Sequence, residues 1–153
     1  MDAIELTPQD SGGPSPTTEV HLGPLLELAA DAIEEHVELA ASLDIARALK
    51  LRHHPDIVEL ARMTDQMLTH CATLAVGVGQ IPVGARSPRG AVVLETWTQL
   101  KDDGPADGPL GPWSYTRHLA LAARDMLEEI HDHRRKAAFT GRPGLPPLPP
   151  GAR

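Results

Sequence analysis

The chain has 153 residues, of which 23% are charged, and a formal net charge of -7 from 21 acidic residues against 14 lysines and arginines. A chain of this length forms one domain around a single core. Nucleic-acid binding needs an excess of positive charge that displaces counterions, so we expect no nucleic-acid partner. Leu and Ala dominate the apolar residues and only 3% of the residues are aromatic, which favours helices over strands.

The cysteine content and the N-terminal segment indicate a compartment. Cys71 has no second cysteine with which to form a disulfide or a zinc site. Residues 1–24 lack the basic and apolar segments of a secretory signal. The chain also has no run of about 18 apolar residues that would span a membrane. We therefore expect a cytoplasmic protein with no membrane partner.

The positions of the prolines predict where helices lie. Proline is not tolerated inside a helix, and it is absent from four intervals, which are 25–54, 56–81, 89–104 and 113–142. We expect one all-α domain at 25–138, an antiparallel four-helix bundle with disordered N- and C-terminal tails at 1–24 and 139–153. The second tail contains P-x-x-P spacings, which are typical of partner-docking segments or of spacers.

The first predicted helix covers about residues 25–42 and has one apolar face. The apolar positions advance mainly by threes and fours, which is the spacing of a helical face; they are Leu25, Leu28, Ala29, Ala32, Ile33, Val37, Ala40 and Leu43. The rest of the surface is acidic, without Lys or Arg, through Glu27, Asp31, Glu34, Glu35 and Glu38.

The other three helices have clearer ends. We expect Pro55 in the first turn of the second helix, which Pro82 terminates. Ser87 followed by Pro88 is typical of an N-cap and the first helical position, so the third helix starts there. The fourth runs from about Gly111 to about Ala138. Each of these helices has an apolar stripe. On the second helix it is Ile57, Leu60, Ala61, Met67, Leu68, Cys71, Leu74, Ala75 and Val78; on the third, Val93, Leu94, Trp97 and Leu100; and on the fourth, Leu119, Ala122, Ala123, Met126, Leu127 and Ile130.

The histidines do not have the spacing of a metal centre. A di-metal bundle needs two Glu-x-x-His motifs, and the chain has one, from Glu128 to His131. His131 and His133 point about 200° apart on a helix and cannot chelate together; the alternative is a solvated helix end. The chain also lacks a nucleophile elbow and a phosphate-binding loop. The sequence therefore predicts no metal site, no catalytic residues and no cofactor.

His70 lies on the apolar stripe of the second helix, in steps of four, three and four with Met63, Met67 and Leu74. It is therefore partly buried. One interpretation is a core or interface histidine whose hydrogen bonds are satisfied. The other is a ligand-binding or pH-sensitive group.

Three short patterns occur in the second, third and fourth helices. They are Leu68-Thr-His-Cys-Ala-Thr-Leu74, Glu95-Thr-Trp-Thr-Gln-Leu100, and Leu121-Ala122 with His131 ten residues after the leucine. Together they cover about 56–133 and resemble an uncharacterised actinobacterial family of small helical proteins, which is associated with natural product biosynthesis and has no defined activity. The resemblance implies no substrate, cofactor or mechanism.

The resemblance nominates His70, Glu95 and His131 as binding residues, one from each of three helices. If all three face inward, they form a small polar site within the bundle. A polar network that fixes the register of the helices is the alternative and needs no ligand. Glu95 lies about 200° from both Val93 and Trp97 on its helix, so a solvated position is also open.

These observations predict a non-enzymatic helical-bundle protein that binds a protein partner or forms a homo-oligomer, linked to natural product biosynthesis as the resemblance implies. One short third helix leaves part of the apolar stripes uncovered, which favours a dimer. The alternative is a small-molecule or metal-binding bundle with a polar site between helices.

Overall fold

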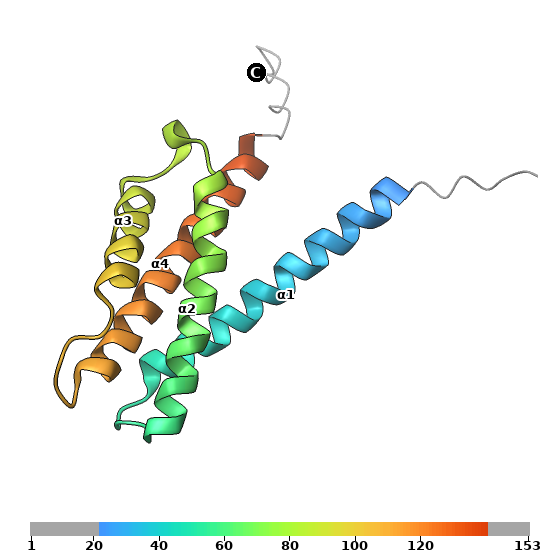
Figure 1. Cartoon of the computed structure of the whole chain (residues 1–153). Helices are drawn as coiled ribbons and strands as arrows, with labels where there is room; N and C mark the ends of the chain where they lie inside the picture. The colour runs from blue at the N-terminus through green and yellow to red at the C-terminus, as the bar shows by residue number, and fades with distance from the viewer. Residues whose placement is uncertain (1–21, 141–153) are drawn as a thin grey trace, which may run out of the picture.

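The computed structural model describes residues 22–140 (Figure 1). Within that range the chain is all-helical and contains no strand, as predicted. The elements are α1 (Leu22–Lys50), α2 (Ile57–Gln80), the 3-10 helix η1 (Val83–Ala85), α3 (Pro88–Asp103) and α4 (Gly111–Thr140). None of these helices is long and apolar enough to cross a membrane. The two predicted tails lie largely outside the described residues.

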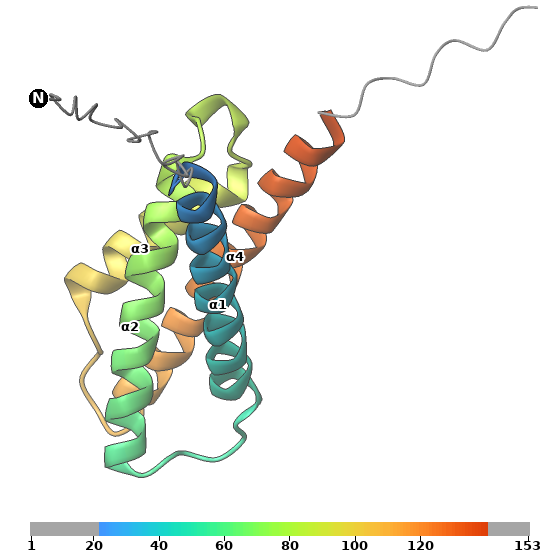
Figure 2. The ribbon, with the colours of Figure 1, turned by 90° about the vertical axis from the view of Figure 1, so that its right-hand side faces the viewer.

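Helix α4 is the centre of the bundle and contacts α1, α2 and α3. Its most extensive contact is with α2, which runs in the same direction, whereas α1 and α3 run the opposite way (Figure 1). In Figure 2, α1 lies on the side of the bundle that faces the viewer. The core therefore lies between α2 and α4, with α3 packed against one side and the C-terminal part of α1 against another.

The side chains of α2 and α4 supply most of the core. Met67, Leu119 and Met126 are fully buried, and all six predicted stripe residues of α4 are buried, as expected. Gly77 lies at the α2–α4 contact, where an added Cβ would be 2.9 Å from Cδ1 of Ile130. The absence of a side chain there lets α4 pack closely against α2. On α2 the prediction was wrong at the N-terminal end, because Ile57 and Ala61 are exposed.

Helix α1 is longer than the sequence indicated. It begins at Leu22, inside the predicted tail, and continues to Lys50 instead of ending near residue 42. The C-terminal extension follows because residues 43–50 contain neither Pro nor Gly, the two residues that most disfavour a helix interior. At the other end Pro24 lies in the first turn of the helix, where proline is tolerated.

Only the C-terminal turns of α1 enter the core. Ala41, Ile45 and Ala48 are buried, whereas every residue from 22 to 36 is exposed. The apolar face predicted for the first helix therefore does not pack into the bundle, and the N-terminal half of α1 projects away from it (Figure 1).

Two helix starts are fixed by side-chain caps. The Ser87 hydroxyl accepts a hydrogen bond from the backbone N–H of Gly90 and caps α3, as predicted. Helix α2 begins one residue after Asp56, whose carboxylate accepts from the N–H groups of Val58 and Glu59, both at 2.9 Å. The predicted place of Pro55 in the first turn was wrong because Asp56 takes the cap position.

Candidate interaction surface

Two histidine–carboxylate contacts hold α1 against the bundle. Nε2 of His70, on α2, donates to Oδ2 of Asp44 at 2.9 Å. Nε2 of His131, on α4, donates to Oε2 of Glu38 at 3.0 Å. The His70 side chain is only 14% exposed, so its ring fills the contact between α1 and α2 as well as binding the carboxylate.

An arginine of α4 strengthens the same contact. Nη1 of Arg134 lies 2.6 Å from Oε1 of Glu38, and its Nη2 lies 3.0 Å from Oε2 of Glu34. Arginine donates in a fixed fork that suits carboxylate oxygens. Arg134 belongs to the basic end of α4, which we define as Arg134, Arg135 and Lys136. Glu34 and Glu38 of α1 pair with Arg134, and these ion pairs fix which side of α1 faces the bundle.

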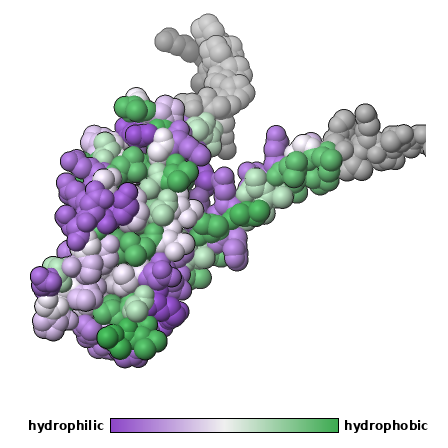
Figure 3. Space-filling model, viewed as in Figure 1, coloured by the Kyte–Doolittle hydropathy of each residue, from purple (hydrophilic) through white to green (hydrophobic). Residues whose placement is uncertain are grey.

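The opposite side of α1 is apolar and exposed. Successive residues of a helix are rotated by about 100°, so Leu39 and Leu43 point roughly 120–160° away from the buried Ala41 and Ile45. We call this surface the outer face of α1 and define it by Leu25, Leu28, Ala32, Leu39 and Leu43, all exposed. Its four leucines are 54–66% exposed. Figure 3 shows hydrophobic residues along α1 where it leaves the bundle.

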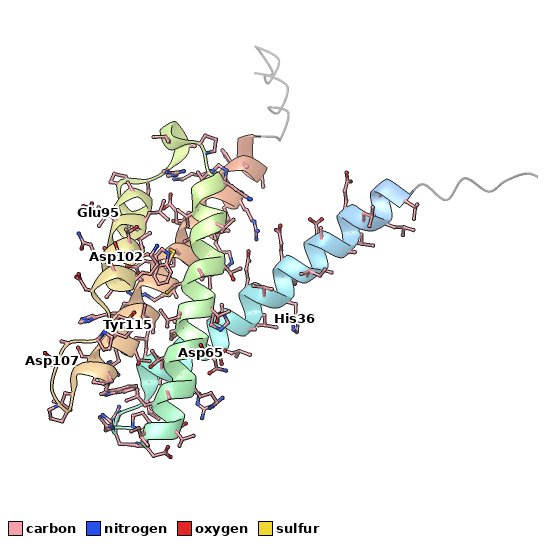
Figure 4. All side chains as sticks on the ribbon, viewed as in Figure 1. His36, Asp65, Glu95, Asp102, Asp107 and Tyr115 are labelled. Atoms are coloured by element: carbon pink, nitrogen blue, oxygen red, sulfur yellow. The ribbon has the colours of Figure 1, made fainter. Side chains whose placement is uncertain are left out.

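The structure does not bring the three predicted binding residues together. His70 and His131 are each bound to a carboxylate of α1, and the side chain of His131 is 48% exposed. Glu95 is exposed on α3, and its carboxylate makes no hydrogen bond or ion pair with any described residue. Figure 4 shows it on the outer side of α3, across the molecule from His36 of α1. Within residues 22–140, no group of three or more His, Cys, Asp or Glu residues could hold a metal ion.

A groove of about 480 Å³ lies between α1, α2 and α4. Apolar side chains form much of its wall, and polar side chains from all three helices also line it. The lining residues are Ile33, Glu34, Val37, Glu38, Thr73, Leu74, Val76, Gly77, Gln80, Ile81, Ile130, His133 and Arg134. None of the three predicted binding residues lines this groove.

A second hollow is lined by cationic residues at the C-terminal end of α1. It contains Lys50, Arg52, Trp113 and Arg117, and the Arg117 guanidinium carbon lies 5.5 Å from the centre of the Trp113 ring. Nη1 of Arg117 donates to the backbone carbonyls of Leu49 and Leu51. Cations at a helix C-terminus satisfy its free carbonyls and its dipole, so this cluster is explained as a cap of α1.

Glu129 is a buried carboxylate that joins α4 to the start of α3. It is 4% exposed, and its Oε1 accepts from the backbone N–H of Ser87 at 2.8 Å. Its Oε2 accepts from the Ser87 hydroxyl. A Cβ on Gly90 would lie 2.7 Å from Glu129, so the glycine leaves the space that this carboxylate occupies. Glu129 thus completes the cap of α3 from another helix, and sequence reasoning did not find this role.

The pKa of Glu129 reflects opposing effects. Burial is the largest single effect and raises the pKa, and the negative charge of Asp132 raises it further. The two hydrogen bonds from Ser87 and the positive charge of Lys136 lower the pKa and together outweigh these effects, so the pKa of Glu129 is lowered. The carboxylate is therefore ionised at neutral pH and serves as an acceptor for the cap.

The one thiol is buried in the core. Sγ of Cys71 donates to the backbone carbonyl of Leu119 at 3.3 Å. Burial raises the pKa of Cys71 to about 12, and burial likewise raises the pKa of Tyr115, whose hydroxyl donates to the carbonyl of Leu100. Because the thiolate is the reactive form of cysteine, Cys71 is a packing residue and not a nucleophile.

Neither a family model nor a curated protein nor a solved structure matches this chain. Function is therefore inferred from the geometry of the described residues.

Proposed function

We propose that this protein is a non-enzymatic binding protein that self-associates, and that the outer face of α1 is its binding surface. The supporting observation is that the N-terminal half of α1 is helical although every residue from 22 to 36 is exposed. Isolated helices of about 15 residues are marginal in water, and helices in proteins are stabilised mainly by packing of an apolar face. An exposed row of leucines on such a segment is typical of an interaction surface.

We further propose a topology, a compartment and a role for the protein on the basis of its sequence. The four helices are an antiparallel bundle, and the protein acts in the cytoplasm as an accessory factor, linked to natural product biosynthesis as the resemblance implies. The basic end of α4 supports the role of α1 as a binding element, since it engages carboxylates on one side of α1 and leaves the leucines of the other side free of the bundle.

The test is the mass of the full chain by sedimentation equilibrium at low to high micromolar concentrations. We expect twice the chain mass of 16.4 kDa at the upper end and dissociation on dilution. A mass of one chain at every concentration would overturn the proposal.

A matched pair of variants locates the surface. Ala32→Glu places a charge on the outer face, whereas Ala30→Glu places the same charge on an exposed residue about 200° away around the helix. We expect Ala32→Glu to be monomeric and Ala30→Glu to behave as the wild type. If both variants associate like the wild type, the outer face is not the binding surface.

A second candidate function is small-molecule binding in the groove between α1, α2 and α4. Its volume of about 480 Å³ lies within the range of ligand pockets, and it has the usual apolar wall with a few polar groups. Anilinonaphthalene sulfonate, an apolar anion, is a suitable fluorescent probe. We expect Thr73→Trp, which fills the groove, to abolish its binding, and Thr69→Trp on the adjacent turn to leave it unchanged. Equal binding by both variants would exclude the groove.

A further inference from the structure

The exposed side of α1 follows a seven-residue repeat along most of the helix. Residues spaced alternately by three and four give the a and d positions of a heptad. The a positions are Leu22, Ala29, His36 and Leu43, and the d positions are Leu25, Ala32, Leu39 and Ala46. We call these eight residues the α1 seam. Seven of them are exposed, and Ala46 is half-buried.

The length and the direction of the seam fit a coiled coil. It extends over more than three heptads, which is the length at which such a repeat indicates a coiled coil, and about 36 Å along the helix. It points away from Ala41 and Ile45, the residues of α1 that enter the core. A second helix packed on the seam would therefore not collide with the bundle of the chain that carries the seam.

The seam is also free of carboxylates. Glu27 and Glu34 occupy the heptad position farthest from the seam, and only Glu35 flanks it. His36 is its single polar member, and one polar residue at an a position is a known means of fixing the register of paired helices.

From this pattern we infer that the occupant of the seam is α1 of a second copy, paired antiparallel about a two-fold axis near residue 34. This inference rests on the proposed self-association and adds its partner, direction and register. In an antiparallel pair each a position faces a d position of the partner. With the full seam overlapped, the layers are Leu22 with the partner's Ala46, Leu25 with the partner's Leu43, Ala29 with the partner's Leu39, and Ala32 with the partner's His36.

Packing and the helix macrodipoles both favour this direction. Every antiparallel layer contains at least one large side chain, and each alanine faces a larger residue, which fills space evenly between two helices. A parallel pair would place Ala29 against the partner's Ala29 and Ala32 against the partner's Ala32, which leaves two adjacent layers underfilled. It would also align the macrodipoles of the two helices in the same direction.

Nitroxide distances test the direction. Cysteines that replace Glu27 and Glu35 carry the labels, because these two residues are exposed and their carboxylates make no hydrogen bond or ion pair with the described residues. The buried Cys71, with its raised pKa of about 12, does not react. In the inferred register, the two labels at position 35 are offset by about 3 Å along the axis and those at position 27 by about 21 Å.

We expect a short distance at position 35 and a clearly longer one at position 27 in the full-length dimer. A difference that matches only the lateral separation of the two heptad positions, without the axial offset at position 27, shows a parallel pair, which overturns this inference and leaves the proposed self-association standing. A single-chain mass overturns both. His36→Leu gives an independent measure, because an apolar residue in the seam tightens the dimer about tenfold or more; an unchanged or weaker dimer contradicts the placement of His36 in the seam.

Discussion

The cap that Glu129 provides to α3 gives the sharpest test of how the bundle is held together. In Glu129→Gln, the amide keeps the volume of the side chain but loses the charge, and an NH₂ group replaces one of the two oxygens that accept from Ser87. A hydrogen bond to a charged group contributes about 1.5–3 kcal/mol and a neutral one about 1 kcal/mol. With two such bonds affected, we expect a loss of about 2 kcal/mol.

The assay is thermal unfolding followed by circular dichroism at one protein concentration. A loss of about 2 kcal/mol corresponds to a fall in melting temperature of roughly 8 °C for a folded region of this size. Glu128→Gln is the matched control, because Glu128 is the adjacent residue and its ion pair with Arg89 has side chains 48% and 60% exposed. Exposed pairs contribute at most about 1 kcal/mol. Equal melting temperatures for the two variants would refute the tertiary cap.

The pH dependence provides a second criterion. Because the pKa of Glu129 is lower in the folded state than its ordinary value of 4.5, its contribution to stability is complete above that value and is lost as the pH falls through the folded pKa. The difference in stability between the wild type and Glu129→Gln should therefore shrink below about pH 4.5. A difference of the same size at neutral and at strongly acidic pH would contradict the role of the ionised carboxylate.

Three further predictions concern packing. Gly90→Ala should lower the free energy of unfolding by about 2 kcal/mol in urea titrations, because the new Cβ meets Glu129 at 2.7 Å. Gly79→Ala is the control and should be neutral or stabilising by up to about 1 kcal/mol, because a Cβ there has nothing within 4 Å. A Gly79→Ala variant less stable than Gly90→Ala would contradict the close contact. Leu119→Ala should cost about 3 kcal/mol in the same assay, since this side chain is fully buried, and a cost below 1 kcal/mol would mean that it lies outside the core. Cys71 should react with a thiol reagent at pH 8 only as fast as the protein unfolds, because the buried thiol has a pKa of about 12, and rapid labelling of the folded chain would disprove its burial.

The sequence predicted the helices of this protein well where Pro and cap residues mark their ends. Ser87 and the turn before Gly111 place α3 and α4 correctly because local chemistry decides those boundaries. The sequence predicted the ends and the packed face of α1 poorly, since the apolar spacing of this helix does not show which face packs on the bundle. That choice depends on Asp44 and Glu38 finding histidines 26 and 93 residues away.

The same limit applies to the predicted binding residues. His70 was expected to be partly buried, and it is, but its partner Asp44 belongs to another helix and carries no local signature. Glu129 was missed among the neighbouring acidic residues of α4. The sequence does contain a signal for the role of Glu129. A Ser N-cap is often followed three residues later by a Glu that accepts from the backbone N–H of the N-cap. Gly90 occupies that position here, so the acceptor has to come from another part of the chain.

Hydrogen exchange of the backbone amides tests the central claim most directly. If α1 of a second copy covers the seam, the amides of residues 25–36 gain protection as the protein concentration rises, while those of α2 and α4 exchange at the same slow rate throughout. Residues 41–48 of α1, which enter the core of their own chain, serve as the internal reference. Unprotected amides at 25–36 at every concentration would contradict the account, since this half of the helix would then have no partner.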